Sequence, residues 1–413
     1  MKSQIPKVLH PICGKPMLGY VLDLAKDLKL EPTFVVVGHK KELLKTILDE
    51  YKARPIHQER LLGTADAVSR VKSALKGFSG NILILYGDQP LLQVETLKKL
   101  IQKHLENKAS ATILSASMAN PFGYGRIIRD NYARITAIIE EKDASPPQKN
   151  LSEINTGIIC FKKEALFKAI SRIRPDNAKK EYYLTDAIKI MAGEGLVIES
   201  LCITDDAAQA QGINSRQDLA QAQKIMRLRI LEKIMDAGVT VVDPDSTYID
   251  AACSLGQDTV IYPFTIIEKG VKIGKFCQLG PFCHLRPESI IEDKAIIGNF
   301  TELVRCRIGK NTLMKHFSYL GDALVGSNVN IGCGTVAANF DGKNKQKTVI
   351  ADNAFIGSDT VLRAPVKIGK KSITGAGAVV TKDVKAGEVV VGVPARPLKK
   401  TRITTNKMSN YHE

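Results

Sequence analysis

Asp88 stands at the end of an apolar run, in the segment "LYGDQPLL" (85–92), and its carboxylate could hold a metal ion. Ligands of open α/β sheets bind beyond the carboxyl ends of the strands, which is where this residue would lie. Mg²⁺ is a hard cation that prefers carboxylate and phosphate oxygens, so an aspartate suits it. An aspartate that only begins the next turn is the common alternative, and Asp88 therefore needs support from other motifs.

Further motifs of the first half carry small and polar residues at similar places. The segment "QERLLGTADAV" (58–68) puts Gln58, Gly63 and Thr64 in a loop before a helix, where backbone N–H groups can meet a base or a phosphate. Gly and Asn also mark ordinary turns, so each motif is weak when taken alone. Four more segments add small, polar and acidic groups at strand ends: "GYGRI" (123–127), "IIEEKDA" (138–144), "EINTGI" (153–158) and "EYYLTDAI" (181–188).

The elements that would position these residues alternate between strands and helices. Short apolar runs at 33–39, 81–90 and 111–117 are bounded by turn residues, and they predict buried strands of a mostly parallel sheet. Helix-like segments such as 41–53 lie between them. This alternation predicts a doubly wound α/β domain. A long helix over 215–238 follows, with apolar residues three and four apart and Gly238 as a C-cap.

The second half has a six-residue period that neither a helix nor an ordinary strand explains. A period of six with small residues beside each apolar position indicates a hexapeptide β-helix, in which six residues form one flat side of a coil. Three such chains commonly associate through their flat sides. The apolar positions run without a break through Leu255, Ile261, Ile267, Ile273, Leu279, Leu285, Ile291, Ile297 and Leu303, and resume in new phase at Ile308, Met314, Leu320, Ile350, Ile356, Leu362 and Ile368.

Two segments of the coil carry residues that could do chemistry. The segment "LMKHFSYLGDALVGSNVNIGCGT" (313–335) contains His316, and the ordinary pKa of imidazole, about 6.5, suits general base catalysis near neutral pH. A solvated coil histidine is the alternative. The segment "AANFDGKNKQKT" (337–348) interrupts the ladder with polar residues, and we expect it to form a loop that carries function.

Composition restricts the class of protein and of partner. The net charge of +16 favours anionic partners, but aromatic residues make up 6% with no Trp, and no nucleic-acid recognition motif occurs. Small phosphorylated substrates, or plain surface lysine, account for the charge equally well. The eight cysteines show no CxxC pair, which predicts reduced thiols in a cytosolic protein. No apolar run approaches the ~20 residues that span a bilayer.

The order and spacing of these motifs resemble one family from Pro6 to about Pro397. The chain resembles the bifunctional enzyme that makes UDP-N-acetylglucosamine, which joins an N-acetylglucosamine-1-phosphate uridylyltransferase to a glucosamine-1-phosphate N-acetyltransferase. The resemblance implies a nucleotidyltransferase-like α/β domain followed by a left-handed parallel β-helix of hexapeptide repeats. It also implies a homotrimer that uses UTP, glucosamine-1-phosphate, acetyl-CoA and N-acetylglucosamine-1-phosphate, without nucleic acid or a membrane span.

The resemblance assigns uridylyltransferase roles to nine residues. The reaction it implies is in-line attack of a sugar phosphate oxygen on the α-phosphate of UTP, which expels pyrophosphate. Asp88 and Asn214 would hold the catalytic Mg²⁺, and Lys7 of "PKVLH" would neutralise phosphate charge. The remaining assignments are Gln58, Gly63 and Thr64 on the uracil side, and Gly125, Glu140 and Asn155 on the sugar side.

The resemblance also assigns the acetyltransferase residues. His316 would be the general base that takes a proton from the amine of glucosamine-1-phosphate as the amine attacks acetyl-CoA, so we expect activity to fall at acidic pH. Arg286 and Lys345 would hold the sugar phosphate. The pocket would also contain Tyr319, Asn330 and Asn339, while Ser358, Ala376 and Arg396 would lie along acetyl-CoA.

Three features depart from the family pattern. Val304 stands where a phosphate-binding lysine is common, followed by Arg305, and Phe340 stands where a tyrosine is usual. In the family, a central strand and a Gly-rich loop ending in Thr-Arg come before the counterpart of "MKSQIPKVLH". We therefore expect unpaired edges on two neighbouring strands and weak uridylyl transfer by this sequence. A longer protein in the cell is the explanation we favour over decay of this half.

These expectations define the domains and leave two other functions open. The expected domains are residues 1–214, a linker helix at 215–238, a β-helix at 239–400 and a tail at 401–413. One alternative is a sugar-phosphate nucleotidyltransferase whose β-helix only trimerises or regulates. The other is a non-catalytic scaffold that binds anions. Release of CoA with glucosamine-1-phosphate would separate these functions from the acetyltransferase.

Overall fold

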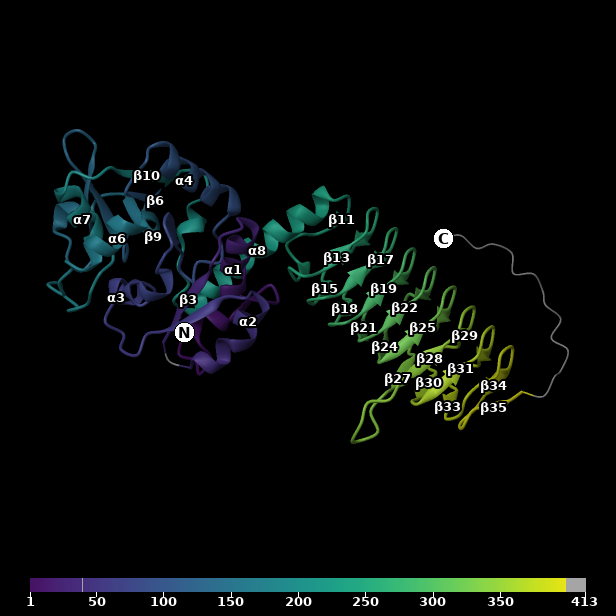
Figure 1. The fold of residues 1–413 in the computed structure, drawn as a ribbon. Helices are drawn as coiled ribbons and strands as arrows, with labels where there is room; N and C mark the ends of the chain where they lie inside the picture. Colours follow the sequence, from purple (N-terminus) through teal and green to yellow (C-terminus); the bar gives the residue numbers. More distant parts are fainter. Residues whose placement is uncertain (39, 399–413) are drawn as a thin grey trace. The chain divides into compact units, whose positions relative to one another are not determined.

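The computed structural model describes residues 1–38 and 40–398 (Figure 1). By their contacts they belong to two compact units, Met1–Ile225 and Met226–Glu413. The division lies inside helix α8 (Arg216–Asp236), within the segment expected as a linker helix. Gly238, at φ +90°, follows the end of this helix as expected for a C-cap. The expected tail at 401–413 lies outside the described residues.

The first unit is an α/β domain whose strands form two separate main sheets. The larger sheet has the order β10-β6-β9-β7-β8, with β5 paired to β9, and the smaller sheet pairs β3 with β4 in parallel. A short hairpin pairs β1 (Pro11–Ile12) with β2 (Lys15–Pro16). The strands of the two main sheets are β3 (Phe34–Val37), β4 (Arg54–His57), β5 (Asn81–Ile84), β6 (Ala111–Ser117), β7 (Gly125–Arg129), β8 (Ile135–Ile139), β9 (Glu153–Lys162) and β10 (Ile198–Ile203).

Helices connect these strands and pack on the sheets through their apolar faces. In α4 the buried residues Leu97, Leu100 and His104 recur at the spacing of one helix face. The α-helices before α8 are α1 (Met17–Asp27), α2 (Lys45–Glu50), α3 (Thr64–Ser69), α4 (Val94–Glu106), α5 (Pro146–Lys149), α6 (Lys163–Ile170) and α7 (Asp186–Gly193). The 3₁₀ turns are η1 (Lys7–Leu9), η2 (Lys41–Leu44), η3 (Ser73–Leu75) and η4 (Ala207–Ala210).

The predicted strands of this unit are confirmed, with two corrections. The expectation of a mostly parallel sheet is wrong for the larger sheet, because β9 pairs antiparallel with β5, β6 and β7, and β7 pairs antiparallel with β8. The apolar runs at 33–39, 81–90 and 111–117 contain β3, β5 and β6, and β6 occupies all of the third run. The single helix expected over 41–53 is wrong in extent, because η2 precedes a short α2 there. Lys52 has a φ of +52°, a backbone conformation that an α-helix does not contain, so the helix ends before it.

Strands β3 and β5 each lack a partner on one side among the described residues. β3 pairs with β4 alone, and β5 pairs with β9 alone. Their apolar residues are only partly buried, except for Val37 in β3. The expectation of two unpaired strand edges is therefore confirmed in the residues that the structure describes.

The second unit is a parallel β-helix with three flat sides (Figure 1). Successive strands pass from one side to the next, and each pairs in parallel with the strand one coil later. The first side contains β11 (Thr240–Val241), β14 (Val260–Ile261), β17 (Gln278–Leu279), β20 (Ile296–Ile297), β23 (Leu313–Met314), β26 (Asn330–Ile331), β29 (Phe355–Ile356), β32 (Ile373–Thr374), β34 (Val389–Val391) and the antiparallel β35 (Arg396–Pro397).

The other two sides have the same short, regular strands. The second side contains β12 (Tyr248–Ile249), β15 (Ile266–Ile267), β18 (His284–Leu285), β21 (Thr301–Val304), β24 (Ser318–Gly321), β27 (Val336–Ala338), β30 (Val361–Arg363) and β33 (Val379–Val380). The third side contains β13 (Ser254–Leu255), β16 (Lys272–Ile273), β19 (Ile290–Ile291), β22 (Arg307–Ile308), β25 (Ala323–Val325), β28 (Thr348–Ile350) and β31 (Val366–Ile368).

The six-residue ladder forms the core of this coil, as predicted. Apart from Leu255, which is partly buried, the predicted ladder residues are buried in one continuous apolar cluster. Glycine follows several of them because consecutive coils approach closely there. A Cβ on Gly309 would lie 2.5 Å from the backbone carbon of Gly326. The six-residue period therefore reflects both an apolar core and turns that admit little beyond glycine.

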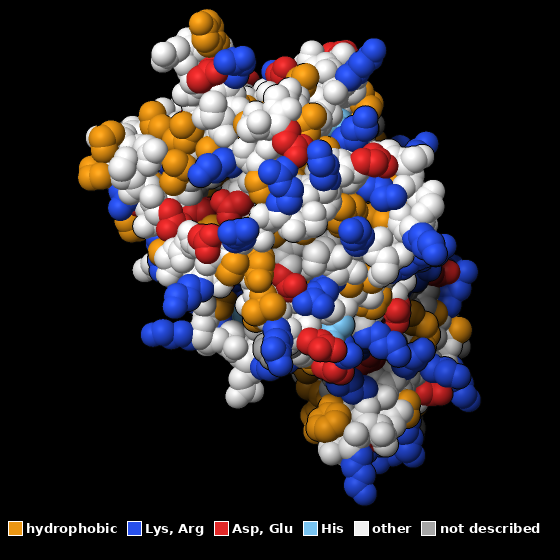
Figure 2. Space-filling view, turned by 60° about the vertical axis from the view of Figure 1, so that its left-hand side comes forward, with side chains coloured by type: hydrophobic (Ala, Val, Ile, Leu, Met, Phe, Trp, Pro, Cys, Tyr) orange, Lys and Arg blue, Asp and Glu red, His pale blue; other side chains and the backbone are white. Residues whose placement is uncertain are grey.

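Charge and thiols are distributed as in an ordinary globular protein. Figure 2 shows Lys and Arg side chains spread over the viewed face, with Asp and Glu among them. All eight cysteines are free thiols, and burial raises the pKa of several, Cys283 to about 12. Among residues 1–38 and 40–398, no helix combines the length and the apolar character that crossing a bilayer requires.

Candidate functional site

Lys7, Asp88 and Asn214 meet in the first unit although they are far apart in sequence. The Lys7 ammonium contacts the Asp88 carboxylate and donates to Asn214 Oδ1 at 2.8 Å. Ile213 N–H donates to the Asp88 carbonyl at 3.0 Å, which joins the two segments through the backbone as well. Oxygen atoms of Asp88 and Asn214 therefore lie around one point, which the Lys7 ammonium occupies.

The start of helix α8 fixes the position of Asn214. The backbone N–H groups of Asn214 and Ser215 donate to Asp218 Oδ2 at 2.9 and 2.8 Å, and Asp218 N–H donates to Ser215 Oγ at 3.0 Å. Burial alone would raise the pKa of Asp218, but these hydrogen bonds outweigh it and lower that pKa. This reciprocal capping holds the Asn214 amide beside Asp88.

The residues around these oxygens suit a magnesium ion that also binds phosphate. Mg²⁺ is commonly held by one or two carboxylates together with substrate phosphates and water. Asp88 and Asn214 supply one carboxylate and one amide oxygen, and no group of three His, Cys, Asp or Glu side chains that could hold a metal occurs in the described part of the chain. The donor set thus fits a metal shared with a phosphorylated substrate.

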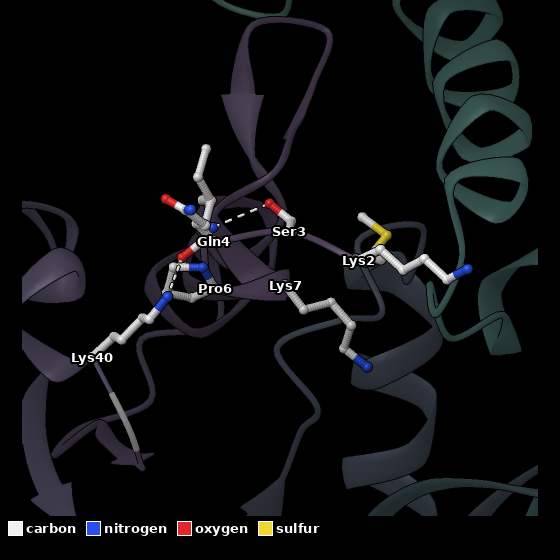
Figure 3. A pocket seen from close by; sticks show the side chains of 8 residues that line it. Lys2, Ser3, Gln4, Pro6, Lys7 and Lys40 are labelled. Carbon is white, nitrogen blue, oxygen red and sulfur yellow. Dashed lines mark hydrogen bonds between the residues drawn. The ribbon is translucent and has the colours of Figure 1, made fainter.

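A cationic pocket of about 330 Å³ lies at the start of the chain (Figure 3). Lys2, Lys7 and Lys40 line it together with the backbone of the first residues. Lys40 Nζ donates to the Gln4 carbonyl at 2.5 Å, and Figure 3 shows its side chain reaching across to Gln4. The three lysines among the lining residues favour an anionic ligand in this pocket.

The residues expected on the uracil side form one hydrogen-bonded loop. Gly63 has a φ of +118°, and a Cβ there would lie 2.5 Å from the Tyr182 carbonyl oxygen, so glycine is required. Thr64 Oγ1 accepts from Leu184 N–H at 2.9 Å. Gln58 is buried and donates to Asp66 Oδ2 at 2.8 Å and to the Gly63 carbonyl at 3.3 Å. These bonds fix the loop geometry in advance of any ligand.

The residues expected on the sugar side meet near the starts of β7 and β9 and the end of β8. Gly125 and Asn155 are paired across β7 and β9, and a Cβ at Gly125 would lie 3.5 Å from both carboxylate oxygens of Glu140. Burial raises the pKa of Glu140, although Thr185 Oγ1 donates to Oε1 at 3.1 Å. The half-buried carboxylate of Glu140 can accept hydrogen bonds from sugar hydroxyls.

Tyr86 connects the metal side to the sugar side, and its role was missed from the sequence. Burial first, and then the charges of Glu140 and Asp88, raise the pKa of Tyr86 to about 12. Its ring fills the space at Gly157, where a Cβ would lie 2.7 Å from a ring carbon. Tyr86 stands two residues before Asp88 in the segment "LYGDQPLL", and this position was the one sign in the sequence that it could lie near the site.

One column of turns in the second unit brings His316 into register with the residues expected along acetyl-CoA. Leu313, Asn330, Phe355 and Ile373 are paired in successive coils, and the residue three positions after each stands at the same turn. The side chains of this turn column, which we call the CoA column, are His316, Cys333, Ser358 and Ala376. Cys333 is half-buried and the other three are exposed.

The next corner of the coils, after β21, β24 and β27, carries a polar network. Arg305 binds Asp322 through two hydrogen bonds of 2.6 and 2.9 Å, and Asn339 Nδ2 donates to Asp322 Oδ2 at 2.6 Å. The Arg305 guanidinium is the first cause, and Asn339 a further one, of a lowered pKa at Asp322. A Cβ at Gly321 would lie 2.6 Å from the Tyr319 hydroxyl oxygen, which places that hydroxyl over the network.

Arg286 stands one coil before this network, and Lys345 stands in the segment that follows Asn339. Arg286 Nη1 lies 3.1 Å from Glu302 Oε1, and Glu302 is paired with Tyr319 across β21 and β24. Lys345 stands in a hairpin between β27 and β28, closed by a bridge to Phe340, and its charge contributes to the lowered pKa of Asp322. Figure 1 shows that hairpin projecting from the coils, as expected for 337–348.

The structure also describes the positions that depart from the family pattern. Val304 is buried, and Arg305 next to it is held by Asp322 instead of pointing freely into the pocket. Arg286 and Lys345 are both exposed. Asn330 lies on the first side and Arg396 in β35, and in the described part of the chain neither side chain is hydrogen-bonded to the Asp322 network.

Comparison with known proteins agrees with both halves of this arrangement. The nucleotidyl transferase family matches residues 2–206, and the bacterial transferase hexapeptide family, defined by six repeats, matches residues 347–382. Proteins described as "Bifunctional protein GlmU" are similar over nearly the whole chain. Those of Shouchella clausii and Listeria monocytogenes are each 42% identical over 93% of this chain and 91% of their own length.

A third relative gives the same result. The "Bifunctional protein GlmU" of Syntrophotalea carbinolica is 42% identical over 93% of this chain and 90% of its own length. With an α/β nucleotidyltransferase unit followed by a left-handed β-helix of hexapeptide repeats, the chain is a transferase and belongs to the family of bifunctional enzymes that synthesise UDP-N-acetylglucosamine.

Proposed function

We propose that the second unit transfers the acetyl group of acetyl-CoA to glucosamine-1-phosphate, with His316 as the general base. The observation that carries this proposal is the CoA column, in which His316 stands in register with Ser358 and Ala376 and strand β24 leads from His316 to Asp322. The exposed imidazole takes a proton from the sugar amine as its nitrogen attacks the thioester carbon. The tetrahedral intermediate then collapses, and CoA leaves as its thiol.

The charged residues around Tyr319 would hold the sugar phosphate during this step. Arg286 and Lys345 are exposed, while the guanidinium of Arg305 is paired with the Asp322 carboxylate. Charge-assisted hydrogen bonds to phosphate are short and strong, so two cations can fix the sugar with its amine toward His316. Asn330 would line the same sugar pocket, and Arg396 would contact a phosphate of acetyl-CoA.

The first unit would use the product of this step for uridylyl transfer. Asp88 and Asn214 would hold Mg²⁺, which neutralises phosphate charge when it is bound. Lys7, with Lys2 and Lys40 around the cationic pocket, would bind the triphosphate of UTP, and the Gly63 loop would bind its base. Glu140 and Asn155 would position N-acetylglucosamine-1-phosphate for in-line attack on the α-phosphate.

We propose that residues 1–413 alone perform this second step slowly. Strand β5, which leads into Asp88, has one open edge toward β3, and a cavity of about 570 Å³ adjoins both strands. Catalysis of phosphoryl transfer depends on groups that are held in place before the reaction. A strand with one free edge holds Asp88 less firmly than a strand paired on both sides.

Replacing Asp88 with asparagine should lower the remaining uridylyl transfer by about 20-fold, because the amide keeps one oxygen for the metal but loses its charge. The measurement is the release of pyrophosphate from UTP in the presence of N-acetylglucosamine-1-phosphate at increasing Mg²⁺, and the magnesium concentration at half-maximal rate should rise. Asp130→Asn is the matched control, since Asp130 pairs with Arg134 on an exposed turn. Unchanged rate and unchanged magnesium dependence in Asp88→Asn would contradict the metal assignment.

Alkylation of Cys333 should reduce acetyl transfer about tenfold, because the half-buried thiol lies in the CoA column between His316 and Ser358. The rate of CoA formation is measured by mass spectrometry before and after iodoacetamide treatment. Alkylation should change the rate of Cys333→Ala less than about twofold. Cys202→Ala, which removes an exposed thiol of the first unit, should stay sensitive. Equal loss in Cys333→Ala would show that another residue is responsible.

Exposed aromatic residues and free thiols bear on the oligomeric state and the cellular compartment of the enzyme. We propose that it acts as a homotrimer, which is supported by the exposed aromatic stack of Phe264, Phe282 and Phe300 on the β-helix, with ring centroids 4.8 and 5.1 Å apart. We also propose that it acts in the cytoplasm. The eight free thiols support that proposal, because disulfides are rare in reducing compartments.

A further inference from the structure

Gln58 is a buried polar side chain at the edge of the smaller sheet of the first unit. It directly follows β4, and its backbone N–H donates to the Val37 carbonyl at 2.9 Å, which continues the pairing of β4 with β3. Gln58 therefore lies just beyond the carboxyl ends of two parallel strands, where ligands of open α/β sheets bind. The residue is only 7% exposed, and a polar group at this depth needs hydrogen-bond partners.

Both partners of the Gln58 amide nitrogen are acceptors. Nε2 donates to Asp66 Oδ2 at 2.8 Å and to the Gly63 carbonyl at 3.3 Å. A carboxylate and a backbone carbonyl have no proton to give, so an amide oxygen in this place would face two other oxygens. The side chain thus keeps its NH₂ group toward Asp66 and its oxygen Oε1 on the opposite side. No hydrogen bond among the described residues uses Oε1.

Arg70 determines which oxygen of Asp66 is available to Gln58. Nη2 of Arg70 donates to Asp66 Oδ1 at 2.7 Å, which leaves Oδ2 for Gln58. Asp66 stands on helix α3, whose start is held because Ala65 N–H donates to the Tyr182 carbonyl at 2.9 Å. The Asp66 side chain is 12% exposed and that of Arg70 is 43% exposed. Asp66 therefore accepts from one exposed and one buried side chain, with one donor for each carboxylate oxygen.

An acceptor in a fixed orientation can distinguish between nucleotide bases. Uracil that is bound to ribose through N1 has one N–H group, at N3, between two carbonyl oxygens. Cytosine has no proton at N3, and its N3 is itself an acceptor. Gln58 Oε1 can accept from the N3–H of uracil, but it would face the lone pair of the cytosine N3. A site built around one hydrogen bond rejects a ligand that cannot make it, because a buried polar group is left unpaired.

We propose that Asp66 sets the base specificity of the first unit, because it holds the Gln58 amide with its oxygen toward the base. Asp66 acts through Gln58 and not on the nucleotide, so it is a positioning residue. The inference rests on the proposed binding of UTP and adds the group that makes this site select a base with a ring N–H. Thymine has the same N3–H as uracil, so this contact separates uracil from cytosine and not from thymine.

The unaltered chain gives the first test. Pyrophosphate release with N-acetylglucosamine-1-phosphate and Mg²⁺ is measured once with UTP and once with CTP, and kcat/KM should favour UTP at least about 100-fold. Release with neither nucleotide would contradict the proposed uridylyl transfer, and this inference would fall with it. Equal kcat/KM for the two nucleotides would overturn this inference alone.

The variant Asp66→Asn replaces the carboxylate with a group of the same shape that can also donate. Arg70 is a donor only, so it takes the oxygen of the new amide and leaves the NH₂ group toward Gln58. Gln58 should then turn its oxygen toward that NH₂ group and its own NH₂ toward the base. The ratio of kcat/KM for UTP to kcat/KM for CTP should fall at least about tenfold. An unchanged ratio in Asp66→Asn would overturn the proposal.

Combining Asp66→Asn with Arg70→Met separates amide orientation from a general effect on the loop. Without Arg70, the new amide can turn its oxygen toward Gln58, and the UTP preference should return to within about threefold of the parent chain. Arg70→Met alone keeps the carboxylate and should keep the parental ratio. Partial unfolding lowers both rates and leaves their ratio unchanged. A double variant with no more UTP preference than Asp66→Asn would show that the loop was merely loosened, which overturns the proposal.

Discussion

Replacing His316 with alanine should lower the rate of acetyl transfer about 10³-fold, within the usual range for loss of a general base. The amine of glucosamine-1-phosphate must lose a proton as it attacks, and the exposed imidazole in the CoA column is placed to accept it. The loss should fall on kcat with little change in KM, because the imidazole acts on the reacting nitrogen in the transition state. Mass spectrometric measurement of CoA formed with glucosamine-1-phosphate checks both constants.

Two comparisons separate a catalytic His316 from a structural one. His57→Ala removes another exposed histidine, in β4 of the first unit, and should leave acetyl transfer unchanged. His316→Ala should also retain uridylyl transfer at the level of the parent chain, because the two units have their own cores. An alanine variant that keeps more than about a tenth of the parental kcat would be inconsistent with general base catalysis by His316.

Replacing Asp322 with alanine should lower kcat/KM for glucosamine-1-phosphate about 10²-fold. Asp322 holds Arg305 through two hydrogen bonds and accepts a third from Asn339, so its removal releases two polar side chains into the pocket. Unlike the loss at His316, most of this loss should fall on KM, because the network shapes the site that binds the sugar. Asp322→Asn keeps an acceptor for Asn339, so its kcat/KM for glucosamine-1-phosphate should lie between those of the parent chain and of Asp322→Ala.

A double-mutant comparison identifies the cause of the Asp322 effect. Arg305→Met removes the main partner of Asp322, and the double variant should be little worse than Asp322→Ala alone, because both changes break the same pair. Steady-state kinetics at several concentrations of glucosamine-1-phosphate give kcat/KM for Asp322→Ala, for Arg305→Met and for the double variant. Fully additive losses would mean that Arg305 and Asp322 act separately. Arg305 would then bind the phosphate itself, in place of the lysine that Val304 lacks.

The core of the β-helix could be predicted from the sequence because its physical cause is local and periodic. Each ladder position must be apolar because it lies in the core of the coil. Several positions beside the ladder must be glycine, because a Cβ at Gly309 or its equivalents would meet the backbone of the next coil. Strand β6 was equally predictable, because a seven-residue apolar run bounded by turns has few alternatives. The 3₁₀ turn η2 before α2 could not be predicted, because where the helix begins and ends there depends on the backbone angles of single residues.

The sequence identified candidate site residues more easily than it showed which of them lie together in the fold. His316 and Cys333 lie 17 positions apart, but 25 positions separate Cys333 from Ser358, since the hairpin between β27 and β28 interrupts the period. Sequence spacing alone therefore does not show that they share a column. The pair of Arg305 and Asp322 was missed for a related reason. Arg305 has a φ of +52° at a coil corner, and side-chain direction there does not follow strand alternation.

The most direct test of the acetyltransferase site is a crystal structure of this chain with CoA and glucosamine-1-phosphate. CoA should lie along the column of Cys333, Ser358 and Ala376 with its thiol toward His316, and the sugar phosphate should contact Arg286 and Lys345. A sugar amine within hydrogen-bond distance of the His316 imidazole would agree with the proposed chemistry. CoA bound on another side of the coil, with His316 facing neither ligand, would contradict it.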